Sequence, residues 1–223
     1  SDSGPDSDDM MSMEPPPPPN PSDMAAMPDT VPPPSDATEP PTPEMVQANQ
    51  KKLDEVEQLI ASANWRQMKP GAEALLELNL SPEQFKRAAA LYDIADLATY
   101  YRGGIERGLA TLSTGNTFEI VKDLPVIVVE VTPDSLSIKA NKKTWTYSLD
   151  ELPPRLMEKL AGFAIDQDRP DSIAGLALYR LIHPATNEEY RKDAFEQLAS
   201  VDQQLETVDT ESLQQVAKEL LSE

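Results

Sequence analysis

Side chains able to do acid–base or nucleophilic chemistry are few in this sequence. It has a single histidine, His183, and no cysteine, so a serine–histidine pair has at most one base and thiolate catalysis is excluded. His183 comes just before Pro184 at the end of a predicted helix, where a cationic imidazole stabilises the helix dipole. The strings typical of serine hydrolases, phosphate-binding loops and zinc proteases do not occur. The sequence therefore predicts no catalytic residue, and we expect the protein not to be an enzyme.

One acidic segment resembles the start of a calcium-binding loop. Asp166, Asp168 and Asp171 have the opening spacing of such a loop. However, Arg169 and Pro170 occupy positions that need an oxygen ligand and a free backbone, and no glycine or closing glutamate follows in register. We interpret the segment as an exposed turn in which Asp171 or Ser172 caps the next helix. The sequence predicts no metal site and no cofactor.

Aromatic side chains supply the only candidate contact surface. Tyr100 and Tyr101 are adjacent in a predicted helix, so they cannot face the same way, and we expect one of them to be exposed. Trp145 and Tyr147 alternate with threonines in a predicted strand, which favours a place in the core over a sugar-binding platform. Tyr100 and Tyr101 are therefore the candidate contact residues.

Carboxylates leave an enzymatic alternative open. The chain has 39 Asp and Glu residues, and a glycosidase needs only one suitable carboxylate pair. Tyr101 and Trp145 are aromatic side chains that a glycan could stack on. A polysaccharide-binding or carboxylate-dependent glycan-hydrolysing domain is thus the alternative to a protein-interaction module.

The first 45 residues differ in composition from the rest of the chain. Residues 1–50 contain ten acidic residues, 14 of the 22 prolines and no Lys or Arg. Such a segment has too little apolar surface to offset the entropy of ordering it, and its proline runs favour extended polyproline II. We expect residues 1–45 to be a disordered, acidic, proline-rich tether.

The remaining residues predict a mainly helical α+β fold. Apolar residues recur at helical spacing over residues 46–113 and again over 153–223, and Ser81-Pro82-Glu83-Gln84 is a strong helix start. We expect the helix that starts there to weaken at Gly103-Gly104. The two helical segments resemble repeat hairpins, and residues 114–152 between them predict a small SH3-like antiparallel sheet or barrel.

The register of the predicted sheet follows from alternation. Four short apolar runs separated by turn residues lie between residues 117 and 149. Alternation places Ser137 and its polar neighbours in water. The inward set is predicted to include Ile127, Val129, Leu136, Ile138 and Trp145. The face of the run Val126–Val129 stays open, because a one-residue slip would exchange its two faces, and alternation in the two later strands defines the register better.

Charge limits the partners and indicates a location. The net charge is -20 and no basic stripe interrupts it, so nucleic acid and anionic lipid are not expected to bind. No apolar run is long enough to span a bilayer. The chain begins at Ser1 rather than Met and continues with an acidic tether, which favours export to the periplasm or cell envelope, with a lipid anchor upstream of Ser1 as one form of attachment.

Four segments between Leu91 and about Leu198 carry a resemblance to known proteins: Tyr100–Gly104, Val126–Val131, Tyr147–Pro154 and Gly175–Tyr179. The order of these parts resembles that in uncharacterised, envelope-associated bacterial proteins of the planctomycete type. It implies a helix–small sheet–helix unit outside the cytoplasm, and it implies no activity or site residues. Together these observations predict a non-enzymatic, tethered interaction module that binds protein, with polysaccharide as the alternative partner.

Overall fold

The longest element of the fold is helix α3 (Pro82–Ala110), which has 29 residues. Its start is the predicted capping box: Ser81 Oγ accepts a hydrogen bond from the Gln84 backbone N–H at 3.3 Å, and Gln84 Oε1 accepts one from the Ser81 N–H at 3.4 Å. Pro82 fits the first helical position because its missing N–H has no partner there anyway. The sequence alone therefore fixes where this helix begins.

The computed structural model describes residues 40–201, 204–205 and 208–221. They form a mixed α+β unit, as predicted; most of the predicted tether lies outside the described residues. None of the helices in these ranges combines the length and the hydrophobicity needed to cross a bilayer. Besides α3, the helices are α1 (Pro43–Ala61), α2 (Met68–Leu76), the 3-10 turn η2 (Leu149–Glu151), α4 (Pro154–Ala161), α5 (Pro170–Ile182), α6 (Glu188–Ser200) and α7 (Thr210–Leu221).

Helix α3 continues through Gly103 and Gly104, where the sequence predicted a weak point. Instead of breaking the helix, glycines allow other elements to approach it closely. A Cβ atom at Gly104 would lie 2.9 Å from Ile165 Cδ1, and one at Gly108 would lie 1.8 Å from the backbone oxygen of Leu160. Glycine is thus required at Gly108 because helix α4 packs its backbone directly against α3.

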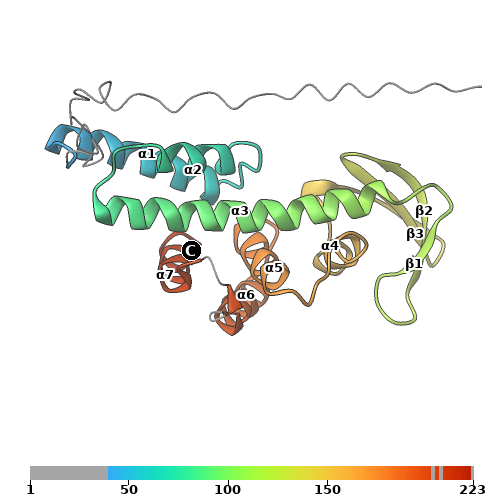
Figure 1. Cartoon of the computed structure of the whole chain (residues 1–223). Helices are drawn as coiled ribbons and strands as arrows, with labels where there is room; N and C mark the ends of the chain where they lie inside the picture. The colour runs from blue at the N-terminus through green and yellow to red at the C-terminus, as the bar shows by residue number, and fades with distance from the viewer. Residues whose placement is uncertain (1–39, 202–203, 206–207, 222–223) are drawn as a thin grey trace, which may run out of the picture. The chain divides into compact units, whose positions relative to one another are not determined.

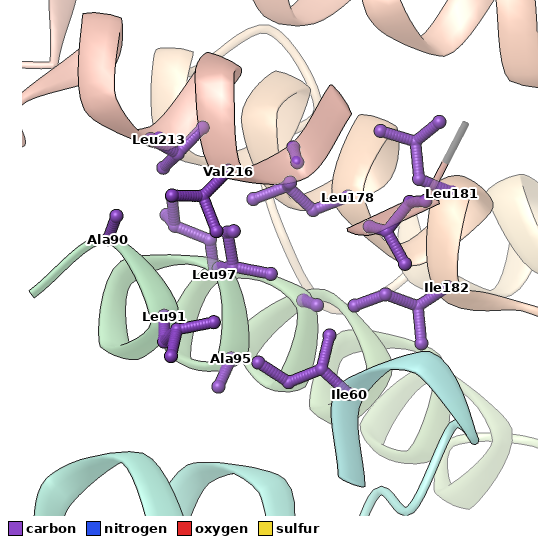
Figure 2. Close-up of a cluster of buried hydrophobic side chains, with 14 of the residues drawn as sticks. Ile60, Ala90, Leu91, Ala95, Leu97, Leu178, Leu181, Ile182, Leu213 and Val216 are labelled. Atoms are coloured by element: carbon purple, nitrogen blue, oxygen red, sulfur yellow. The ribbon is translucent and has the colours of Figure 1, made fainter. Parts of the chain in front are cut away.

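Two hydrophobic cores lie along α3. Figure 1 shows this long helix running past the other helices, with the sheet at its C-terminal end. The first half of α3 packs against α1, α2, α5 and α7, and the close-up in Figure 2 shows Leu91 and Ala95 among side chains that include Ile60, Leu178 and Val216. The second half of α3 packs against α4, α5 and the sheet. A single helix therefore carries both cores and fixes the sheet relative to the helices.

The sheet is an open antiparallel meander of four described strands in the order β1-β2-β3-β4. These strands are β1 (Thr117–Glu119), β2 (Pro125–Thr132), β3 (Ser135–Ala140) and β4 (Lys143–Ser148). The described strands do not close on themselves, so the predicted SH3-like barrel is not confirmed. A short antiparallel sheet packed on helices replaces it, and strand β4 is left at one edge.

The predicted inward set is right for β3 and wrong for β2. Leu136 and Ile138 are buried as expected. In β2, however, Ile127 and Val129 are 47% and 41% exposed, and their neighbours Val126 and Val128 are buried instead. All the side chains of this run are apolar, so its sequence does not distinguish the two faces, and a bulge between Val128 and Glu130 shifts the pairing again.

Two further side chains of the sheet differ from the expected pattern. Trp145 pairs with Ile138 and so lies on the inner face, but its place on an edge strand leaves it 38% exposed. Ser137 was predicted to face water but is buried, and its hydroxyl forms a hydrogen bond with Thr146 Oγ1 at 2.8 Å. The hydrogen bond that Ser137 was expected to make with water is therefore made with a hydroxyl of the neighbouring strand.

Candidate functional site

The two predicted contact residues do not share a surface. Tyr101 is 1% exposed and lies in the core beside the sheet, with its ring centre 5.8 Å from that of Tyr179. Burial raises the pKa of the Tyr101 hydroxyl well above its usual value. Tyr100 is half-buried and lines a cavity on another side of α3. The prediction that Tyr101 belongs to a contact surface is wrong, because its turn of α3 faces the helices and not solvent.

A concave feature of the described residues lies between the helices and the sheet. A cavity of about 700 Å³ opens between the α1–α2 loop, the second half of α3 and the β2–β3 turn. An adjoining cavity of about 370 Å³ shares part of the same lining. We call the two together the Trp65 groove, and the residues common to both are Trp65, Arg66, Arg102, Asp134 and Leu149.

Arg102 is fixed in the groove by two carboxylates. Its Nε donates to Glu106 Oε1 at 3.1 Å, one helical turn further along α3, and its Nη1 donates to Asp150 Oδ1 at 2.6 Å. The guanidinium carbon lies 5.1 Å from the centre of the Trp65 ring. Only 13% of the Arg102 side chain is exposed. Arg102 thus joins α3 to η2 and orients the indole, while its own charge is already neutralised.

Arg66, in contrast, is available to a ligand. It lies next to Trp65 in the α1–α2 loop, is exposed, and lines both cavities of the groove. Within the described ranges it forms no ion pair or side-chain hydrogen bond. A guanidinium in this state can bind a carboxylate or phosphate with two parallel hydrogen bonds.

Beneath the groove, Trp65 is held by an aromatic cluster. Its ring stacks on Tyr179 of α5 with ring centres 4.9 Å apart and an interplanar angle of 26°. Tyr179 is fully buried, and this burial is the main reason that its pKa is raised well above the usual value. Such stacking restrains the indole, so the aromatic wall of the groove is formed before any ligand arrives.

His183 belongs to this buried cluster and does not have the predicted role. It follows α5 as expected, but it is fully buried, with its ring centre 5.3 Å from that of Tyr179. Burial lowers the pKa of the imidazole below its ordinary value. Its Nδ1 accepts a hydrogen bond from the Ala185 backbone N–H at 3.2 Å, which requires that nitrogen to be unprotonated. His183 is therefore neutral, and the predicted interaction of a cation with the helix dipole is wrong.

A second cavity, of about 610 Å³, contains Tyr100 and several carboxylates. Asp96 pairs with Lys69 at 2.6 Å, and Asp171 pairs with Arg169 at 2.7 Å. Asp93 has no hydrogen-bond or ion-pair partner among the residues that the structure describes. Burial first, and then two neighbouring aspartates, raise the pKa of the Asp93 carboxyl to about 6. We call this cavity the Asp93 pocket.

The acidic turn before α5 is consistent with the structural interpretation of the sequence. The Asp168 backbone N–H donates to Asp166 Oδ1 at 3.1 Å, which closes the turn. Helix α5 begins at Pro170 after Arg169, without the predicted side-chain cap from Asp171 or Ser172. Over the described ranges, no group of three or more His, Cys, Asp or Glu side chains is arranged to hold a metal ion.

Comparison with known proteins found no relative of this chain, because no family model, curated protein or solved structure matches it. The resemblance to envelope-associated bacterial proteins therefore stays a prediction. The sequence pattern did not identify the residues common to the two cavities of the Trp65 groove, or Asp93, as candidate site residues. The adjacent pair Trp65-Arg66, in a gap between two predicted helices, was the one feature that could have indicated the groove.

Proposed function

We propose that this protein is a non-enzymatic interaction module that binds a protein partner in the Trp65 groove. The carrying observation is the pairing of a restrained indole with an exposed, unpaired guanidinium, Arg66, in one concave surface. Trp and Arg are the residues that most often dominate the energy of protein interfaces. Apolar side chains next to them complete the wall, namely Leu109, Leu112, Val131 and Pro133.

The groove favours a partner segment with two chemical features. An apolar side chain fits against Leu112 and Val131, and a carboxylate fits Arg66, whose charge no described side chain neutralises. Nucleic acid is an unfavourable partner because the chain carries a net charge of -20.

The proposal includes a location outside the cytoplasm, at the cell envelope. Its support is the composition of the first 50 residues, which are acidic, rich in proline and without Lys or Arg. Such a segment holds a domain away from a surface to which the chain is attached. Fractionation of cells that produce the native protein tests this part, and recovery in the cytosolic fraction would contradict it.

The groove is tested with a photo-crosslinking amino acid placed at Asp134, which keeps Arg66 intact, and, as a control, at Arg155. Both positions are exposed; Asp134 lines both cavities of the groove, and Arg155 lies on α4 outside it. We expect one protein to be crosslinked from position 134 only. With that partner purified, Arg66→Glu should weaken binding by roughly 5- to 30-fold, which corresponds to about 1–2 kcal/mol, while Arg155→Glu leaves it unchanged. Equal crosslinking from both positions, or equal affinities, would refute the groove as the binding site.

A second candidate function, glycan binding or hydrolysis, is favoured by the Asp93 pocket. A carboxyl with a pKa of about 6 is suited to act as a general acid, and Asp96 lies one helical turn away on α3. Incubation with purified cell-wall polysaccharide tests it. Loss of hydrolysis in Asp93→Asn, but not in Glu189→Gln, an exposed carboxylate on α6 outside the pocket, would support this function. No binding or hydrolysis by the unaltered protein would exclude it.

A further inference from the structure

Strand β4 has an open edge. Within the described residues it pairs only with β3, and five of its six residues are exposed. The strand contains no proline and no bulge, both of which proteins commonly use to block such edges. Its free backbone groups can therefore pair with another strand.

The hairpin determines which backbone groups of β4 are free. Asn141 and Lys142 form a two-residue turn with φ of 47° and 66°, so Ala140 and Lys143 form a hydrogen-bonded pair. Bonded and non-bonded pairs alternate in an antiparallel ladder, and the bond of 2.9 Å from Leu149 N–H to the Asp134 carbonyl continues this alternation. The odd-numbered residues of β4 thus bond to β3. The residues whose N–H and C=O groups point to the open edge are Thr144, Thr146 and Ser148.

We propose that this edge pairs with β4 of a second copy of the chain, antiparallel and centred on Thr146. In this register Thr146 faces Thr146 of the other copy, and Thr144 faces Ser148. Each Trp145 then lies directly opposite a Tyr147 in a non-hydrogen-bonded pair, where side chains are closest. Hydroxyl pairs and aromatic pairs are both favourable cross-strand neighbours.

Charge favours a second copy as the occupant. Lys142 and Lys143 lie at the start of β4, and Asp150 and Glu151 follow its end. Antiparallel pairing puts the basic end of one strand beside the acidic end of the other, and it does so twice by symmetry. Centred on Thr146, it places Lys142 opposite Asp150; a shift of two residues would place Lys142 opposite Ser148. In a chain of net charge -20, this edge is a surface where two copies meet without local repulsion.

The pairing makes a weak dimer. Two six-residue strands bury less surface than a standard stable interface, so we expect a concentration-dependent equilibrium and not a permanent dimer. The edge meets the Trp65 groove only at its end, where Ser148 of β4 and the following Asp150 line the smaller of the two cavities. Thr146, at the centre of the proposed pairing, lines neither cavity, so substitutions there test self-association without altering the groove.

Because the chain has no cysteine, single-cysteine variants of the full chain report the register directly. Thr146→Cys places the two sulfurs on residues whose Cα atoms are about 5.5 Å apart in the proposed dimer, which is within disulfide range. Thr144→Cys, on the same edge and the same face, places them much further apart. Under mild oxidation we expect a disulfide-linked dimer from Thr146→Cys and essentially none from Thr144→Cys. Equal yields, or none from either variant, would overturn the proposal.

Sedimentation equilibrium of the cysteine-free chain gives an independent measurement. Thr146→Pro removes an N–H that points away from β3, so the β3–β4 ladder and the circular dichroism spectrum should be preserved. By symmetry the dimer loses two hydrogen bonds, and we expect association to weaken roughly tenfold or more. Thr146→Val keeps the N–H and should associate nearly as the unaltered chain does. A chain that stays monomeric at all concentrations, or a Thr146→Pro variant that associates normally, would overturn the proposal.

Discussion

Replacing glycine by alanine at two positions of α3 should have opposite effects on stability. In a helix interior this change is favourable by about 1 kcal/mol, because alanine loses less backbone entropy on folding. At Gly103 the new Cβ would meet Arg107 Nη1 at 3.0 Å, the end of a flexible and exposed side chain that can move aside. We therefore expect Gly103→Ala to be neutral or to stabilise by up to about 1 kcal/mol.

At Gly108 the same methyl group meets backbone instead. Its Cβ would lie 1.8 Å from the Leu160 carbonyl oxygen, where an ordinary contact needs more than 3 Å, so α4 must move by over an ångström. Overpacking of this kind costs about 1–3 kcal/mol or more, which exceeds the gain in helix propensity. We expect Gly108→Ala to be less stable than Gly103→Ala by about 1–3 kcal/mol or more, because the gain in helix propensity is common to both variants and cancels in the comparison.

Urea unfolding followed by circular dichroism measures both variants against the unaltered chain. A difference of about 1–3 kcal/mol corresponds to roughly 2–12 °C in melting temperature for a domain of this size. The comparison controls for helix propensity, since the residue change and the helix are the same. If the two variants were equally stable, α4 would not pack its backbone on α3 at Gly108, and the account of the second core would be wrong.

Three further predictions concern the sheet, the Asp93 pocket and the start of α3. Ile138→Asp should destabilise the fold by several kcal/mol, while Lys139→Asp, on the exposed face, should cost little; similar melting temperatures would show that the strand register is wrong. Because the folded-state pKa of Asp93 is raised to about 6, its contribution to stability is lost as pH rises from about 4 to 6, so Asp93→Asn should gain stability relative to the unaltered chain at pH 7 but not at pH 4. Unfolding measured at both pH values tests this, and a gain of equal size at the two would contradict it. Ser81→Ala should lower the free energy of unfolding by about 1 kcal/mol through loss of the helix cap, and an unchanged value would argue against the capping box.

The elements themselves were largely predictable from the sequence. Helical spacing and the Ser81 capping box located α3, and alternation in residues 135–140 gave the correct buried face of β3. In both cases a local pattern of polar and apolar residues distinguishes inside from outside. Where that contrast is missing, as in the apolar run Val126–Val129, the face of the strand could not be predicted.

The candidate sites could not be predicted in this way. Trp65 stacks on Tyr179, and Arg102 joins Asp150, although each pair is far apart in the sequence. The prediction that Tyr101 belongs to a contact surface was wrong because Tyr101 is buried in the second core, and the role predicted for His183 was wrong because its ring is buried against Tyr179. Polar and aromatic side chains are compatible with either a surface or a satisfied interior, so their types alone do not decide between the two.

The sequence by itself determined the mainly helical class, the position of the small sheet, the acidic proline-rich composition of the first 50 residues and the absence of thiol chemistry. These follow from composition and from local periodicity, which need no knowledge of distant contacts. Only the tertiary structure decided that Gly104 and Gly108 are packing positions, that Trp65 and Arg66 line a groove, and that Asp93 has a raised pKa. Each of these depends on burial and on neighbours brought from other elements, and both are set when the helices pack.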